Sequence, residues 1–225
     1  MDALIFDFDG VMVDSEPLHL LYFQQVLATV GIDLSSRDYY DRYVGFDDRD
    51  SFTRIMRDHG QSPTGAQLRE LIARKSALIL KAFAESIKPM PGALDLVRAA
   101  EVAAIPTAIC SGGLRKEIEL AAGAIGALPY FMAIVSAEDV EHGKPDPEGY
   151  CLALARLTQL SGRILMAPKT LVIEDAPGGI AAAKAAGMKV LAVTTSHHAE
   201  ALTAADRVVN SLADVTIGVL EELVR

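Results

Sequence analysis

Two carboxylates follow a short apolar run near the N-terminus, in the sequence IFDFDG that begins at Ile5. Asp7 and Asp9 stand two positions apart, so in an extended chain their side chains point to the same face. Burying an unpaired carboxylate costs several kcal/mol even after relaxation. We therefore expect this pair to have either a structural counter-charge or a role in chemistry.

Polar residues also follow three later apolar runs. Because ligands of open parallel sheets bind beyond the carboxyl ends of the strands, we expect these residues to converge with Asp7 and Asp9 on one rim. They are Ser111 and Gly112 after residues 107–110, Lys144 in the GKPDP segment after residues 133–135, and Glu174 with Asp175 after residues 170–173.

The charges of these residues predict a metal ion and a phosphate. Carboxylates close together repel one another and raise one another's pKa values, and a phosphate dianion would add to the repulsion. A bound Mg²⁺ ion removes the conflict, because it prefers one or two carboxylates, water and substrate phosphate oxygens. Lys144 supplies a further positive charge. Ser111 and the N–H groups of Gly112 and Gly113 form a phosphate seat at a helix N-terminus.

The apolar runs predict the strands of a parallel sheet. Each run is short, uniformly apolar and followed by turn residues and a helical pattern, which is typical of parallel strands covered on both faces. We expect a doubly wound, Rossmann-like α/β fold. Its strands are expected at residues 3–6, 107–110, 133–135, 170–173, 190–193 and 207–209, and its helices near residues 93–103, 114–124, 147–159 and 178–186.

One long segment interrupts this alternation. From residue 15 to residue 88 no strand is expected, and the sequence KPMPG then returns the chain to the sheet. Helical patterns occur near residues 17–30, 36–43, 49–59 and 65–87. We predict a core domain of residues 1–14 and 89–225 and an inserted α-helical cap domain of residues 15–88. Ser15 is expected to cap the first helix of the insert.

The ordered motifs resemble those of the haloacid dehalogenase-like (HAD) hydrolases. They are DFDGVMVDS at residues 7–15, Ser111, Lys144 in GKPDP, and Glu174-Asp175 in VIEDAPGGIAAAKAAGM. The resemblance covers essentially the whole chain, and the inserted cap is similar to that of the β-phosphoglucomutase and phosphoglycolate phosphatase branch. Each motif alone is a weak signal, but all four in order at strand ends form a strong one.

The resemblance implies a role for each core residue. Asp7 is expected to attack phosphorus and form an aspartyl-phosphate, while Asp9, protonated at first, acts as general acid and then as general base. Ser111, Gly112 and Lys144 are expected to hold the phosphoryl group. The implied Mg²⁺ ligands are Asp7, the backbone carbonyl of Asp9, Asp175, and Glu174 either directly or through one water.

Four residues are candidates for contacts with the rest of the substrate. His19 stands where related sugar-phosphate mutases carry a proton-relaying histidine, and Lys75 matches a substrate-facing lysine there. Either could equally be an ordinary residue of a helix surface. The mutases carry a phosphate-gripping arginine three residues after a glycine, where this chain has Asp48, and Arg49 follows one position later. Arg115 could reach a substrate anion or remain solvated.

These residues predict a Mg²⁺-dependent phosphatase that acts on a small phosphorylated metabolite, a sugar or polyol phosphate. The alternative within the same chemistry is a β-phosphoglucomutase-type mutase, which needs a firm cationic grip in the cap, and the displaced arginine favours hydrolysis. A haloacid dehalogenase would need neither Asp9 as an acid nor a metal. A catalytically silent binding module would not need the intact motifs.

The composition restricts the other partners. Across 225 residues the formal net charge is -9, which argues against a broad surface for nucleic acid or anionic membranes. The N-terminus lacks a signal-peptide pattern, and two cysteines indicate no disulfide framework. Gly123, Gly126 and Pro129 interrupt the uncharged run at residues 120–137, so a helix end, a loop and a buried strand are expected there. We expect a cytoplasmic monomer.

Overall fold

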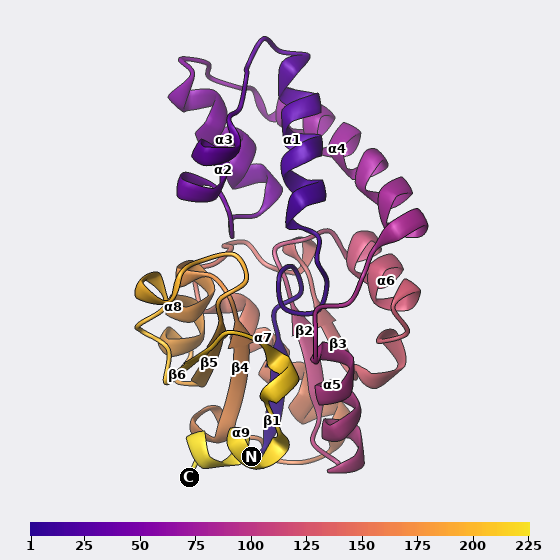
Figure 1. The fold of residues 1–225 in the computed structure, drawn as a ribbon, viewed down its shortest axis with the longest axis vertical. Helices are drawn as coiled ribbons and strands as arrows, with labels where there is room; N and C mark the ends of the chain where they lie inside the picture. Colours follow the sequence, from indigo (N-terminus) through magenta and orange to yellow (C-terminus); the bar gives the residue numbers. More distant parts are fainter.

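The computed structural model describes residues 1–225 and contains one sheet of six parallel strands, in the order β3-β2-β1-β4-β5-β6 (Figure 1). The central strand β1 pairs with β2 on one side and with β4 on the other. The chain order therefore reverses between β1 and β4, and open α/β sheets bind their ligands beside such a point. The strands are β1 (Ala3–Phe6), β2 (Thr107–Cys110), β3 (Ala133–Val135), β4 (Thr170–Glu174), β5 (Lys189–Val193) and β6 (Arg207–Val209).

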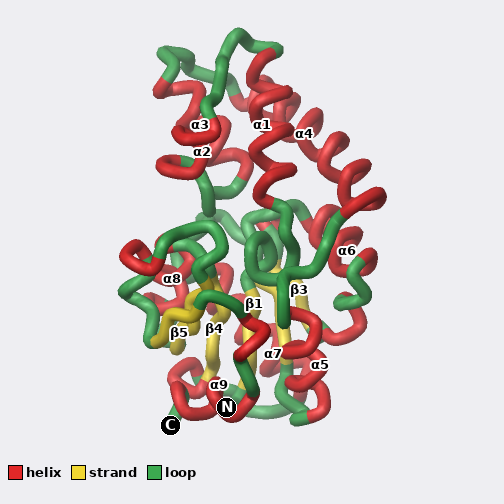
Figure 2. Tube along the Cα trace, in the orientation of Figure 1, coloured by secondary structure: helices red, strands yellow, loops and turns green.

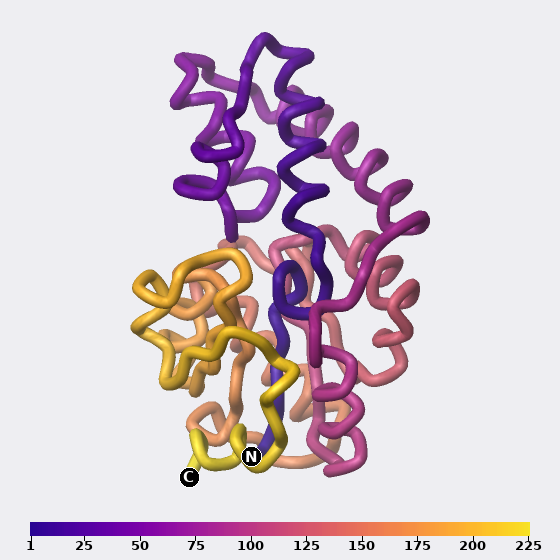
Figure 3. The backbone as a smooth tube through the Cα atoms, viewed as in Figure 1, coloured from indigo at the N-terminus to yellow at the C-terminus, as the bar shows by residue number.

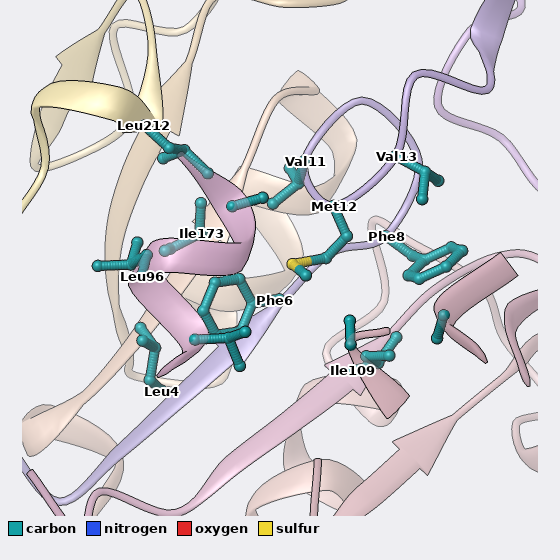
Figure 4. Packing of buried hydrophobic residues seen from close by; sticks show 14 of the residues in the cluster. Leu4, Phe6, Phe8, Val11, Met12, Val13, Leu96, Ile109, Ile173 and Leu212 are labelled. Carbon is teal, nitrogen blue, oxygen red and sulfur yellow. The ribbon is translucent and has the colours of Figure 1, made fainter. Parts of the chain in front are cut away.

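Side chains of β1 alternate between the two faces of the sheet, as the period of two in a strand requires. Leu4 and Phe6 belong to a cluster of 25 buried hydrophobic residues, and Ala3 and Ile5 belong to a separate cluster of 18. Figure 4 shows Leu4 and Phe6 close to Leu96 in the larger cluster. Because both faces of the sheet are covered, every residue of the central strands β1, β2 and β4 is buried.

The core helices cover the two faces of the sheet. Helices α5 (Ala93–Val102), α6 (Arg115–Ala124) and α9 (Ile217–Leu223) contribute to the larger cluster, and α7 (Glu148–Ser161) and α8 (Pro177–Ala185) contribute to the smaller one. Short 3₁₀ helices lie at Leu128–Tyr130, Ala137–Asp139, Ala167–Lys169, Ala199–Ala201 and Leu212–Asp214.

The inserted segment forms helices α1 (Glu16–Ala28), α2 (Ser36–Arg42), α3 (Asp48–Asp58) and α4 (Gly65–Ser86), which enclose a third hydrophobic cluster of 12 buried residues. Figure 3 shows these helices at one end of the molecule and both chain termini at the other. The two connections to the core lie side by side, because the Asp14 N–H donates to the Lys88 carbonyl at 3.0 Å. The exact residues at which a cap domain begins and ends stay a prediction.

The predicted doubly wound α/β fold with a helical insert is confirmed. All six strands and the expected helices are present within a few residues of their predicted bounds, and the C-terminal helix α9 was not predicted. The uncharged run at residues 120–137 contains the end of α6, a loop and strand β3, as expected. None of the helices combines the length and the apolar character needed to cross a membrane.

Candidate active site

Loops at the carboxyl ends of the strands meet the cap and enclose a cleft of about 620 Å³ that is open to solvent. Figure 2 shows these loops gathered between the sheet and helices α1 to α3. The core residues that line the cleft include the seven that the motifs predict on one rim: Asp7, Asp9, Ser111, Gly112, Lys144, Glu174 and Asp175. The polar side chains from the cap are those of Glu16, His19, Tyr39 and Asp48.

Three buried carboxylates share one cation at the base of the cleft. Oxygens of Asp7, Glu174 and Asp175 all lie within 4.8 Å of one another. Lys144 Nζ donates to Asp7 Oδ1 and to Glu174 Oε1, both at 2.6 Å. Burial raises the pKa of Asp175, and the charges of Asp7 and Glu174 raise it further. Burial also raises the pKa of Asp7, against the effect of Lys144. One ammonium group therefore does not balance the cluster.

Protein donors occupy both oxygens of Glu174. Its Oε1 accepts from the Tyr150 hydroxyl at 2.7 Å as well as from Lys144, and its Oε2 accepts from the backbone N–H groups of the next two residues at 2.9 and 3.1 Å. The side chain is fully buried against Gly179, where a Cβ atom would lie 1.6 Å from Oε1. This arrangement fixes Glu174 as the residue that positions Lys144.

Asp175 is held by one of its two oxygens. Its Oδ2 accepts from Ser196 Oγ at 2.5 Å and from Thr195 Oγ1 at 3.1 Å. Gly10 has a φ of +72°, and a Cβ atom there would lie 2.0 Å from the same oxygen, so only glycine fits. No protein donor bonds Asp175 Oδ1 or Asp7 Oδ2. Two such oxygens beside excess negative charge suit a hard cation such as Mg²⁺.

Asp9 accepts hydrogen bonds from three side chains. Ser15 Oγ donates to Oδ1 at 2.5 Å, His19 Nε2 lies 3.2 Å from the same oxygen, and Ser111 Oγ lies 3.4 Å from Oδ2. Burial raises the pKa of Asp9, but His19, the hydrogen bonds from His19 and Ser15, and Lys75 together lower it to about 2. Asp9 is therefore a carboxylate in the ligand-free protein, and its protonation when substrate is bound stays a prediction.

The prediction that Ser15 caps helix α1 is wrong. Its side chain makes no capping hydrogen bond, and its backbone is already in the helical region. The hydroxyl instead donates to Asp9. The cause is the backbone of Ser15, whose φ of -103° and ψ of -21° lie in the helical region, whereas a capping residue is typically extended.

Lys75 and His19 are joined behind the cap side of the cleft. Lys75 Nζ donates to His19 Nδ1 at 2.8 Å, so we assign the ring proton to Nε2, which faces Asp9. Lys75 Nζ also donates to Asp48 Oδ1 at 2.5 Å. The Lys75 side chain is 0% exposed. The structure thus brings His19 to the cleft, but it places the predicted substrate contact Lys75 one layer behind the cleft wall.

Arg49 and Arg115, the other two predicted substrate contacts, do not line the cleft. Arg49 is exposed on helix α3, where its carbonyl accepts from Thr53 Oγ1. The Arg115 guanidinium donates to Asp139 Oδ2 at 2.6 Å and to the Ile134 carbonyl at 3.1 Å, so it joins α6 to the end of β3. Neither guanidinium is part of the cleft lining.

The predicted phosphate seat lies under a loop of the cap. Ser111 Oγ accepts from the Gly113 N–H at 2.9 Å. Asp47, which caps helix α3, rests on two core glycines: a Cβ atom at Gly143 would lie 2.7 Å from Asp47 Oδ2, and one at Gly112 would lie 3.4 Å from Asp47 Cβ. The glycines therefore allow the cap to approach the phosphate seat closely.

Four further cleft or support residues were not predicted from the sequence. Glu16 Oε2 accepts from the Tyr39 hydroxyl at 2.8 Å, which joins α1 to α2 in the cap wall. Tyr150 and Ser196 bond the motif carboxylates from elements distant in sequence. No local sequence pattern identifies these four residues. The glycines after the motif acids could have indicated where buried carboxylates lie, because Gly10 makes room for Asp175 and Gly179 makes room for Glu174.

The chain resembles known proteins over nearly its full length. A family model described as haloacid dehalogenase-like hydrolase matches residues 4–193. Validoxylamine A 7'-phosphate phosphatase of Streptomyces hygroscopicus subsp. limoneus is 32% identical over 213 residues, which are 94% of this chain and 94% of that protein. β-Phosphoglucomutase of Bacillus subtilis strain 168 is 31% identical over 228 residues, covering 99% of this chain and 95% of that protein. The crystal structure of CbbY from Rhodobacter sphaeroides in complex with phosphate has a TM-score of 0.87 and 25% identity, and covers 98% of this chain and 99% of that chain.

Proposed function

The chain belongs to the haloacid dehalogenase-like hydrolases, and from this premise we propose that it is a Mg²⁺-dependent phosphatase that hydrolyses a sugar or polyol monophosphate through an aspartyl-phosphate at Asp7. The observation that carries the proposal is the convergence of Asp7, Asp9, Ser111 and Lys144 on one cleft. The names of two relatives, a phosphatase of validoxylamine A 7'-phosphate and a β-phosphoglucomutase, support a small phosphorylated molecule as the substrate.

In the first half-reaction the Asp7 carboxylate attacks phosphorus and the bond from phosphorus to the leaving alkoxide breaks. Lys144 and Ser111, with the Gly112 N–H group, bind the equatorial phosphoryl oxygens and stabilise the charge that develops there. The Gly113 N–H, which the sequence also assigned to this seat, donates to Ser111 Oγ instead. The leaving oxygen must gain a proton. Asp9 can take up a proton from solvent once the phosphate ester lies beside it, because a nearby negative charge raises the pKa of a carboxyl group, and can pass that proton to the alkoxide.

In the second half-reaction water attacks the phosphoryl group on Asp7, and inorganic phosphate leaves. The Asp9 carboxylate accepts the proton of this water, for which its low pKa in the ligand-free protein makes it available. Asp7 then returns to its carboxylate form. The cap restricts the entry of water, because its loop rests on Gly112 and Gly143 above the site.

The residues that would hold Mg²⁺ are Asp7, Asp175 and the backbone carbonyl of Asp9, with Glu174 behind them. When bound, the ion supplies positive charge that offsets both the carboxylates and the phosphoryl oxygens. The fit is supported by the raised pKa of Asp175, which burial and the charges of Asp7 and Glu174 produce. A dication supplies the charge that Lys144 alone does not.

The cap favours hydrolysis over phosphoryl transfer between sugar hydroxyls. A mutase must hold a bisphosphate in both orientations, which requires a cation in the cap that faces the cleft. Arg49 is exposed outside the cleft, Lys75 is paired with Asp48, and Asp48 itself lines the cleft. A second phosphate would meet a carboxylate there.

A panel of phosphorylated sugars and polyols assayed for phosphate release, with Mg²⁺ and with excess chelator, tests the proposal. We expect release that depends on Mg²⁺. Conversion of β-glucose 1-phosphate without net phosphate release would show a mutase instead. Full turnover of a 2-haloacid in excess chelator would show a dehalogenase, and the absence of any reaction with all substrates would indicate a binding module.

A further inference from the structure

The cap side of the cleft has carboxylates but no available cation. Glu16 and Asp48 line it, and none of the arginines and lysines among residues 15–88 does. His19 is the one basic side chain in this wall, and both of its ring nitrogens are engaged, with Asp9 and with Lys75. The part of the substrate farthest from the phosphate therefore meets a negatively charged wall.

The one nearby ammonium group is fully occupied. Lys75 Nζ donates to Asp48 Oδ1 and to His19 Nδ1 and lies 4.3 Å from the centre of the Phe23 ring. Its side chain has no exposed surface. Asp48 thus neutralises the cap lysine that lies behind this wall and adds a carboxylate at the same place. Because Lys75 is paired with Asp48, the cap presents a carboxylate to the cleft rather than a cation that could bind a phosphate.

Two carboxylate oxygens in this wall lack a donor. Asp48 Oδ2 is buried without a hydrogen-bond partner. Glu16 Oε2 accepts from the Tyr39 hydroxyl, and no protein donor bonds its Oε1. A buried acceptor without a donor costs free energy until a donor reaches it. Hydroxyl and ammonium groups can both supply one, but only an ammonium group also offsets the negative charge.

We propose that Asp48 and Glu16 determine substrate choice, so that the enzyme prefers monophosphates of amino sugars or aminated polyols and rejects sugars with a second phosphate. This inference rests on the proposed phosphatase function and adds the substrate class. Specificity of this kind arises from attraction and repulsion together. A cationic amine meets two acidic side chains, whereas a second phosphate meets like charge in a cleft that is partly shielded from water.

Three hexose phosphates with one ring skeleton test the proposal: glucosamine 6-phosphate, glucose 6-phosphate and glucose 1,6-bisphosphate. The readout is kcat/KM for phosphate release at fixed Mg²⁺ and ionic strength. We expect the amino sugar to exceed glucose 6-phosphate by about tenfold, the difference between a charge-assisted and a neutral hydrogen bond. We expect the bisphosphate to fall below glucose 6-phosphate by about 100-fold, because like charges at close range cost several kcal/mol.

Asp48→Asn keeps the shape of the side chain, removes its charge and frees the charge of Lys75. We expect the ratio of bisphosphate to monophosphate turnover to rise by about tenfold in this variant. Glu16→Gln should reduce the preference for the amino sugar over glucose 6-phosphate to less than about threefold. Asp50→Asn is the matched control, because Asp50 is in the first turn of the same helix but outside the cleft wall, and its ratios should equal those of the parent.

Equal turnover of the amino and neutral sugars together with efficient use of the bisphosphate would overturn the proposal. So would unchanged ratios in both charge variants. If Asp48→Asn fails to fold, as judged by its thermal unfolding, the Glu16→Gln ratios decide. Failure of the underlying function gives a different result: no phosphate release from any of the three substrates or from p-nitrophenyl phosphate, with the purified protein folded and Mg²⁺ present.

Discussion

The contact between Gly179 and the Glu174 carboxylate predicts that one added methyl group disables the site. In Gly179→Ala the new Cβ would lie 1.6 Å from Glu174 Oε1 and 2.0 Å from its Cδ. The two groups cannot both stay where they are. Because Gly179 is in helix α8, packed against the sheet, the carboxylate is the part that must move.

The cost follows from what Glu174 would lose. Its oxygens accept from Lys144, the Tyr150 hydroxyl and two backbone N–H groups at 2.6 to 3.1 Å, with no solvent to replace them. Hydrogen bonds to a charged group contribute about 1.5–3 kcal/mol each. If the shift breaks two of the four, the free energy of unfolding falls by about 3–6 kcal/mol, similar to the cost of about 3–5 kcal/mol for breaking a buried ion pair.

Urea denaturation of Gly179→Ala and Gly178→Ala measures this difference. Gly178 is the neighbouring residue in the same first turn, and a Cβ atom there meets nothing within 4 Å. We expect Gly178→Ala to be neutral or up to about 1 kcal/mol more stable, because alanine is the better helix former. We also expect phosphatase kcat/KM in Gly179→Ala to fall by at least about tenfold, because Lys144 loses its positioning partner.

The reasoning would be refuted if the free energies of unfolding of Gly179→Ala and Gly178→Ala agreed within about 0.5 kcal/mol. Such a small difference is typical of surface substitutions, and it would mean that the Glu174 carboxylate is not held next to Gly179.

Three other changes have defined outcomes. Asp9→Asn should leave Mg²⁺ affinity, measured by calorimetry, near that of the parent and slow turnover by about 10²–10⁴-fold, the usual contribution of acid–base catalysis; equal turnover would contradict its role. Ser196→Ala removes a 2.5 Å hydrogen bond to Asp175, so the Mg²⁺ concentration for half-maximal activity should rise by about 10-fold or more. Asp139→Asn should lower the free energy of unfolding by about 1–2 kcal/mol at pH 7, allowing for solvent screening of the two arginines. Although burial raises the pKa of Asp139, hydrogen bonds from Arg156 and Ser136 and the charge of Arg115 lower it below its usual range. This contribution should therefore be complete above pH about 4, the unfolded value, and should decrease as the pH falls further. A difference between parent and variant that grows on acidification would be inconsistent with this sign.

The strands and the core motifs were predictable from the sequence because local pattern determines them. Mainly apolar runs of three or four residues identify buried parallel strands, and the polar residues after them fall on one rim by the topology of the sheet. No knowledge of the cap was needed to predict that the site contains Asp7, Ser111, Lys144 and Asp175. The short helix α9 was missed, because seven residues after a run of turns carry little periodic signal.

The cap side of the site was less predictable, because its contacts join residues far apart in sequence. Lys75 reaches His19 across 56 positions and Asp48 across 27, so an ordinary-looking lysine becomes a buried ion-pair partner. The same holds for the charge state of Asp9, which depends on hydrogen bonds from Ser15 and His19 that no spacing rule predicts. Arg49 stands one position after the place expected for a phosphate-binding arginine, and it does not line the cleft.

Rapid acid quenching of the enzyme during turnover of a ³²P-labelled phosphomonoester, followed by peptide mapping, tests the catalytic role of Asp7 most directly. We expect acid-stable, hydroxylamine-sensitive label on the peptide that contains Asp7. Label on any other residue, or rapid turnover with no label captured and with Asp7→Asn as active as the parent, would contradict the account.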